Sequence, residues 1–220
     1  MNLPRRNVNN LLFLPKNREY VDEMYSALLD FVSAGKTVVV LTHFDTSPRL
    51  LPLIQKSGIE VYKNKQALQR LIFICCENVN AAIKKLFDLH DWTVKPNIII
   101  IDLYTFACST NIVTCFSHDM AKTSTASPFL QQLVQCIAIL FSMMNCLKLD
   151  NPEQKFPAHL QSFTSTPSKV FSILVLQKHD CVLTSSQVEL VTDLYYGINA
   201  FDDFKRIANV ILISSTSINT

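Results

Sequence analysis

The sequence places an acidic residue directly after one of its most apolar runs. Residues 97–101 read Asn-Ile-Ile-Ile-Ile and are followed by Asp102. A continuous apolar run is typical of a buried parallel strand, because such a strand has apolar neighbours on both faces. Open parallel sheets bind ligands at the carboxyl ends of their strands, and an aspartate there can hold the magnesium ion of a nucleoside triphosphate. Asp102 is therefore the first candidate functional residue. The alternative is an aspartate that only caps a strand end.

Phosphate chemistry also needs a phosphate-binding loop. The tripeptide Gly-Lys-Thr at 35–37 matches the end of such a loop, but the glycine required five residues earlier is Asp30. The tripeptide also follows a helical pattern instead of opening a helix, so we interpret it as a helix cap. The expected loop position, residues 15–19, contains no glycine. Lys16 and Arg18 are the groups there that could contact a phosphate, and a solvated loop is the alternative.

Two further sets of polar residues follow predicted strands. Gln177 comes directly after the apolar run at 170–176, where related folds place a polar sensor residue. His43 and Asp45 follow the apolar run at 38–41, at the same edge of the predicted sheet. The alternative for Gln177 is a polar residue that only ends the strand. No third group completes a site with His43 and Asp45, and no catalytic residue is predicted.

The composition predicts one globular domain. The chain has 220 residues, of which 49% are hydrophobic and 17% charged, which excludes global disorder. We expect a short tail over residues 1–10 and a single domain over 11–220. The net charge of +2 indicates no strong preference for nucleic acid.

Cysteine usage and apolar stretches bear on the compartment. The seven cysteines form no C-x-x-C pair, which predicts reduced thiols in a cytosolic or nuclear protein and no zinc or other metal site. The apolar stretch at 133–147 is interrupted by polar residues and is shorter than a membrane span, so we expect no membrane association.

Hydrophobic periodicity predicts strands alternating with helices. Strands are expected at 11–14, 38–41, 71–75, 98–102, 170–176 and 210–213, and helices at 19–33, from 47 to Gly58, at 79–89, 128–149 and 186–196. Polar loops are expected at 108–127 and 151–168. This alternation predicts an α/β fold with a mostly parallel sheet and helices on both faces.

The order of these elements resembles the core of the RecA-type recombinase paralogues. Arg70 precedes the strand at 71–75, and Pro96 and Asn97 precede the strand that ends at Asp102. The sequence is most similar to the short, divergent branch whose members partner a SWIM-type zinc-finger protein. The resemblance implies a RecA-like fold and a nuclear role in homologous recombination and DNA repair. It implies a heteromeric complex with recombinase paralogues that supports recombinase filaments and contacts single-stranded DNA mainly through its partners.

The missing phosphate loop departs from that family. Without its lysine and hydroxyl we expect no ATP hydrolysis and no cofactor, with weak binding of ATP and magnesium left open. Lys16, Arg18, Asp102 and Gln177 are then the equivalents of a degenerate nucleotide site. One alternative is an Elongator-type RecA-like scaffold in transfer RNA modification, and another is a different α/β enzyme.

An exposed surface for a protein partner is also predicted. The phenylalanines at 106, 116 and 201 lie in or near polar segments, so we expect them to be exposed. The chain is then expected to dissolve poorly alone and to be rescued by co-expression with its partner.

Overall fold

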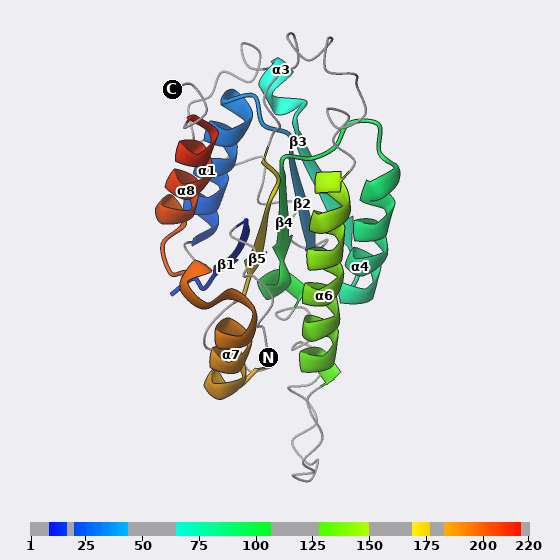
Figure 1. The fold of residues 1–220 in the computed structure, drawn as a ribbon, viewed down its shortest axis with the longest axis vertical. Coiled ribbons are helices and arrows are strands. Elements are labelled where there is room, and N and C mark those ends of the chain that lie inside the picture. Colours follow the sequence, from blue (N-terminus) through cyan, green and yellow to red (C-terminus); the bar gives the residue numbers. More distant parts are fainter. Residues whose placement is uncertain are drawn as a thin grey trace.

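A six-stranded parallel sheet forms the centre of the molecule (Figure 1). The computed structural model describes residues 9–16, 20–43, 65–106, 128–149, 169–176 and 183–216. The strands are β1 (Asn10–Phe13), β2 (Val38–His43), β3 (Leu71–Cys76), β4 (Ile98–Asp102), β5 (Phe171–Val175) and β6 (Ala200–Phe201). Their order is β3-β2-β4-β5-β1-β6, and every neighbouring pair is parallel.

Helices cover both faces of this sheet. The longer ones are α1 (Tyr20–Ser33), α4 (Val79–Asp88), α6 (Pro128–Leu149), α7 (Ser185–Val191) and α8 (Phe204–Thr216). Short ones are α3 (Lys65–Leu68), the 3₁₀ helices η2 (Leu89–Asp91) and η6 (Gly197–Asn199), and the π-helix η5 (Thr192–Tyr196). Figure 1 shows α1 and α8 together on one face and α4 and α6 on the other. This architecture confirms the predicted α/β fold, with a parallel sheet and helices on both faces.

The strand sequences divide the core between the two faces. In β2, Val38 and Val40 face the cluster under α1 and α8, whereas Val39 and Leu41 face the cluster under α4 and α6. The isoleucines of β4 alternate in the same way. Side chains of a strand point to opposite faces in turn, so a strand covered on both faces needs apolar residues at every position.

Several helix ends follow the sequence closely. Gly35 has φ 81°, and the amides of Gly35 and Lys36 donate to the carbonyls of Val32 (3.0 Å) and Phe31 (3.0 Å). These two bonds form a Schellman motif that ends α1. The Gly-Lys-Thr tripeptide is therefore a helix cap, as predicted. At α4 the side chain of Asn78 accepts from the amide of Ala81 in the first turn, so Asn78 is the N-cap of this helix.

Helix α6 has the bounds that the sequence predicts. It is long and apolar enough to cross a membrane by composition alone. However, one side of the helix is buried in the core that α6 forms with α4 and β5, as the periodicity of a core helix requires. The buried residues include Leu133, Ile137, Leu140 and Met144. The exposed positions of the helix form a separate polar stripe that includes Gln131, Gln135, Ser142 and Asn145.

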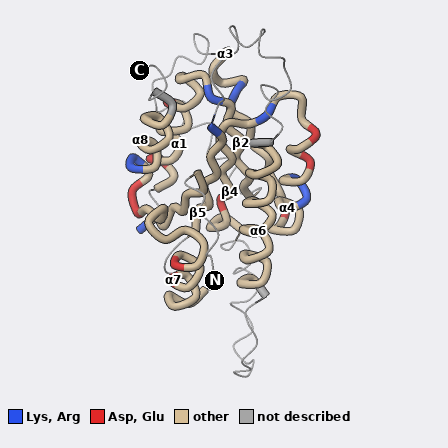
Figure 2. Tube along the Cα trace, viewed as in Figure 1, with Lys and Arg blue, Asp and Glu red and all other residues tan. Residues whose placement is uncertain are grey.

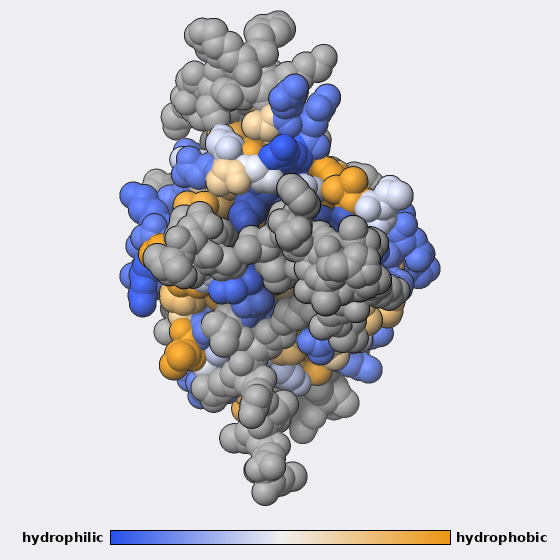
Figure 3. All heavy atoms as spheres, turned by 45° about the horizontal axis from the view of Figure 1, so that its top comes forward, coloured by the Kyte–Doolittle hydropathy of each residue, from blue (hydrophilic) through white to orange (hydrophobic). Residues whose placement is uncertain are grey.

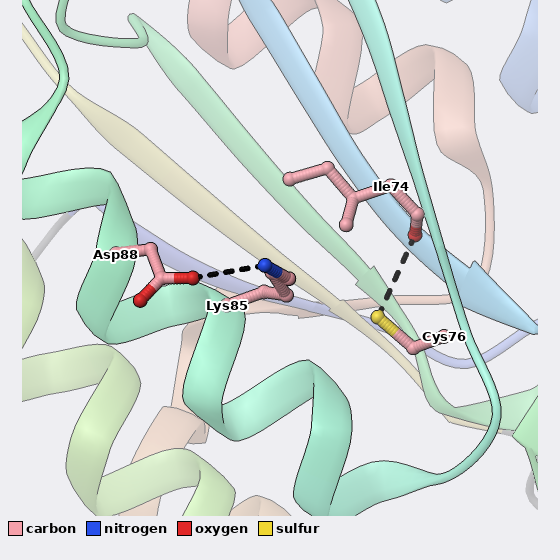
Figure 4. Close-up of polar contacts among 4 residues, drawn as sticks. All are labelled: Ile74, Cys76, Lys85 and Asp88. Atoms are coloured by element: carbon pink, nitrogen blue, oxygen red, sulfur yellow. Dashed lines mark hydrogen bonds and ion pairs between the residues drawn. The ribbon is translucent and has the colours of Figure 1, made fainter.

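The described cysteines are free thiols (Cys75, Cys76, Cys136 and Cys146). Figure 4 shows the Cys76 Sγ directed at the carbonyl oxygen of Ile74, 3.9 Å away, beside the exposed Lys85–Asp88 ion pair of α4. Burial raises the pKa of Cys76, and burial raises the pKa of Cys136 to about 12. Both groups therefore remain unreactive thiols at neutral pH.

Two predictions are wrong. Residues 210–213 belong to α8 and not to a strand, because Phe204, Ile207 and Ile211 lie at helical spacing and are all buried. Phe106 is 1% exposed and so contributes to no surface, while Phe201 is half-buried. The predicted helix after residue 47, the loops at 108–127 and 151–168, and Phe116 lie outside the described residues.

Candidate functional site

Asp102 is the last residue of β4 and lies at the carboxyl edge of the sheet, as predicted, but it does not face solvent. Its side chain is 1% exposed. The hydroxyl of Tyr20, the first residue of α1, lies 3.3 Å from each carboxyl oxygen and donates to the carboxyl group. The amide of Thr105 lies 3.4 Å from Oδ1 and donates weakly. Asp102 is thus held by the protein's own donors.

The environment changes the acidity of both side chains. Burial raises the pKa of Asp102 from 3.8 to about 7, and the hydrogen bonds from Thr105 and Tyr20 oppose this shift only in part. Burial, with the charge of Asp102 next in size, raises the pKa of Tyr20 far above its usual range. Tyr20 therefore stays a protonated donor, and Asp102 is about half ionised at neutral pH.

Aromatic rings close the space around this pair. Tyr20 packs edge-on against Phe13 at the end of β1, with ring centroids 5.8 Å apart, and against Tyr104, 5.5 Å apart. Phe13 in turn packs against Phe204 at 5.1 Å. All four rings are buried. In a phosphate-binding α/β protein this position, between the first strand and the first helix, receives the phosphate at the helix N-terminus.

A second set of hydrogen bonds ties the ends of β2 and β4 together. Thr105 Oγ1 donates to the carbonyl of Asp102 at 2.7 Å and accepts from the amide of His43 at 3.2 Å. The hydroxyls of Thr42 and Thr105 lie 3.2 Å apart. The ring of His43 packs edge-on against Phe106, with centroids 5.9 Å apart. These contacts hold the edge of the sheet and engage His43 in packing.

Lys16 forms an ion pair with Asp202 and not with Asp102. Its Nζ lies 2.6 Å from Oδ2 of Asp202, in the turn between β6 and α8, and both side chains are largely exposed. The hydrogen bond raises the pKa of Lys16 and lowers the pKa of Asp202. Arg206 lies 4.0 Å from the same carboxylate and packs over the ring of Phe201. Within the described residues, no ion pair or hydrogen bond joins Lys16 to Asp102.

Of the predicted nucleotide-site residues, the structure describes Asp102 and Lys16, which have different partners. Asp102 is central, but its partner is Tyr20, which the sequence did not suggest because the two lie 82 residues apart. Arg18, Gln177 and Asp45 lie outside the described residues. Among the residues that are described, no three His, Cys, Asp or Glu side chains lie close enough to hold a metal ion.

Comparison with known proteins finds similar solved structures. No family model and no curated protein matches the sequence significantly. Among solved structures, the chain is similar to the crystal structure of the RadB recombinase, with 12% sequence identity and a TM-score of 0.41. The match covers 76% of this chain and 60% of the RadB chain, so the chain spans less than two thirds of that protein. A likeness at this level carries no argument about function.

Proposed function

We propose that this chain is a non-catalytic RecA-like subunit that acts in homologous recombination and DNA repair. It works within a heteromeric complex that supports recombinase filaments on single-stranded DNA. The observation that carries the non-catalytic part is the enclosure of Asp102, which is 1% exposed and bound by Tyr20.

Phosphoryl transfer needs three kinds of group, which the described residues of this site do not offer. The reaction requires an ionised carboxylate for magnesium, a lysine on the phosphates, and backbone amides that cradle them. Here the carboxyl has a pKa of about 7 and lies behind aromatic rings, and Lys16 pairs with Asp202. The only Gly-Lys-Thr tripeptide caps the far end of α1.

The recombination part of the proposal is supported by the resemblance in sequence. The two segments on which it rests are both strands of the sheet: Arg70 directly precedes β3, and the segment after Pro96 becomes β4 and ends at Asp102. β3 and β4 lie on either side of β2. A nuclear location follows from this function.

A protein partner is supported by an exposed apolar stripe. Leu190, Leu194 and Ile198 are 55%, 64% and 85% exposed, and they follow one another at four-residue spacing along α7, η5 and η6. Leu190 and Leu194 lie on one side of the helix that α7 and η5 form, and Ile198 follows Gly197, where φ is 56° and this helix ends. An exposed apolar row is typical of a protein-binding surface. We propose that it contributes to the contact with a SWIM-type zinc-finger protein or a recombinase paralogue.

Affinity purification of the tagged chain, followed by mass spectrometry, tests the proposal. Recovery of a SWIM-type zinc-finger protein or a recombinase is expected, and recovery of Elongator subunits or of no partner would contradict it. In parallel, L190S/L194S is expected to lose the partner. The matched control I213S, which changes an apolar residue that is 65% exposed on α8, is expected to keep it.

The non-catalytic part has its own test. Adding ATP and magnesium to the purified chain is expected to leave its melting temperature unchanged, since a ligand that binds the folded state raises it. A rise of several degrees that D102N abolishes would overturn this part and leave the partner assignment intact.

A further inference from the structure

Four basic residues lie at the amino edge of the sheet, opposite the edge that contains Asp102. Arg70 directly precedes β3, Lys36 lies two residues before β2, Lys95 three residues before β4, and Lys169 two residues before β5. These four strands are consecutive in the sheet. We call Lys36, Arg70, Lys95 and Lys169 the basic edge.

Backbone hydrogen bonds hold the starts of the four strands in line. The carbonyl of Arg70 accepts from the amide of Val38 at 2.8 Å. The carbonyl of Thr37 accepts from Asn97 at 2.8 Å, and the carbonyl of Asn97 accepts from Phe171 at 2.8 Å. Adjacent strands are about 4.8 Å apart, so the row extends over about 14 Å. The basic edge is thus a line on a rigid part of the sheet and not a feature of a single loop.

The charges of the basic edge are accessible. Arg70 and Lys169 are exposed, and Lys36 is half-buried. None of the ion pairs of the described residues includes these three side chains. Lys95 is half-buried and donates to the carbonyl of His90. Figure 2 shows basic positions gathered at this end of the sheet, and acidic positions on α4 and around α7 and α8.

The guanidinium of Arg70 lies against the turn that ends α1. Arg70 Nη1 lies 2.9 Å from the point that a Cβ on Gly35 would occupy, so the guanidinium lies over the turn that contains Lys36. The C-terminal end of α1 carries partial negative charge, which favours a cation at this turn. Arg70 is therefore stable here without an acidic partner and remains available to an external anion.

The shape of the site favours a polyanion over a single phosphate. A single phosphate is bound by donors that converge on one point, whereas these cations form a row across consecutive strands. Exposed polar side chains accompany the row, at Gln66, Gln69 and Thr93. Figure 3, with this end turned forward, shows hydrophilic side chains gathered there. Arginine and lysine with nearby amides and hydroxyls are the usual contacts to nucleic-acid phosphates.

We infer that the basic edge binds the phosphate backbone of a single-stranded nucleic acid directly. This site lies at the end of the sheet away from the strand ends where α/β folds bind their ligands. It goes beyond the proposed function, in which DNA is contacted mainly through partners. Its contacts are to phosphates, so little sequence preference is expected.

The test measures binding of a fluorescently labelled single-stranded oligonucleotide to the full chain by anisotropy, over a series of salt concentrations. Three phosphate contacts predict a slope of log K against log salt of about −2, since each contact contributes about −0.7. The variant R70Q/K169Q removes two exposed charges. Its slope is expected to fall by about 1.4 in magnitude, and its affinity at 0.1 M salt by about 25-fold.

The control K84Q/K205Q also removes two exposed lysines, one from α4 and one from α8. It is expected to bind like the wild type, and all variants are expected to melt at the wild-type temperature. Equal losses in both variants would overturn the inference, as would a slope near zero or stronger competition by polyglutamate than by unlabelled oligonucleotide. The assay contains no partner protein, so its outcome is independent of the proposed role in recombination.

Discussion

Replacing Asp102 with asparagine should stabilise this protein at alkaline pH. The folded protein raises the pKa of Asp102 from 3.8 to about 7. Between these values the folded state binds more protons than the unfolded chain, so the free energy of unfolding falls as pH rises through this window. The full difference corresponds to about 4 kcal/mol above pH 7, and the change between pH 5 and pH 8 is about 2.5 kcal/mol.

An asparagine cannot ionise, so D102N removes this penalty. Its carbonyl oxygen can still accept from Tyr20. In the wild type the amide of Thr105 donates to Oδ1 at 3.4 Å, and in the variant it would face the side-chain NH₂ group, which is also a donor. Losing that bond costs about 1 kcal/mol. D102N is therefore expected to be about 2 to 3 kcal/mol more stable than the wild type at pH 8 and nearly equal to it at pH 5.

Urea denaturation of both proteins at pH 5 and pH 8 measures these values. The difference between the two proteins removes the contribution of every other titrating group. Asp193→Asn, which changes an exposed aspartate of η5, serves as the control and is expected to leave the difference between the two pH values unchanged. If D102N is less stable than the wild type at pH 8, Asp102 is ionised and well solvated in the folded protein, and the enclosed site described above is wrong.

Three other sets of substitutions test the local structure by the same denaturation assay. Tyr20→Phe removes the donor to Asp102 and should lower stability by about 1.5 to 3 kcal/mol at pH 8, and by less at pH 5, where the carboxyl is largely protonated; an equal loss at both values would mean that only packing changed. Gly35→Ala should cost about 1 to 2 kcal/mol because φ is 81°, and Asn78→Ala about 1 kcal/mol for the lost cap. Ile211→Ala should cost at least about 2 kcal/mol, whereas Ile213→Ala, at a position 65% exposed, should stay within about 0.5 kcal/mol; the reverse order would contradict the helical assignment of α8.

The sequence was sufficient for most of the architecture. Strands covered on both faces need uninterrupted apolar runs, so β2, β3, β4 and β5 were visible as runs separated by helical patterns. The run Val210-Ile211-Leu212-Ile213 looked the same and is helical. Only a longer window, which includes Phe204 and Ile207, reveals the helical spacing of its buried residues. A short apolar run alone cannot distinguish a strand from a buried helix.

Only one residue of the candidate site, Asp102, could be predicted from the sequence. Asp102 was found because it ends an apolar run. Tyr20 gave no signal, because its role depends on the fold bringing the start of α1 against the end of β4. Phe106 was expected at the surface because polar residues follow it, yet it packs in the core under α4 and α6. The chemical state of the site depends on these tertiary contacts.

The contacts of Asp102 also decide whether its carboxyl group can bind magnesium or is held by the protein's own donors. A magnesium ion requires an ionised carboxylate and would stabilise it, which lowers the pKa. Tyr20 supplies hydrogen bonds but no positive charge, so burial dominates and the pKa of Asp102 rises to about 7. For a metal to bind, the Tyr20 ring would have to leave its contacts with Phe13 and Tyr104. This movement would expose three buried rings to water. The same packing that stabilises this end of the sheet therefore supports the proposed non-catalytic role. The binding functions proposed for the described residues therefore rest on other surfaces, the apolar stripe on α7 to η6 and the basic edge.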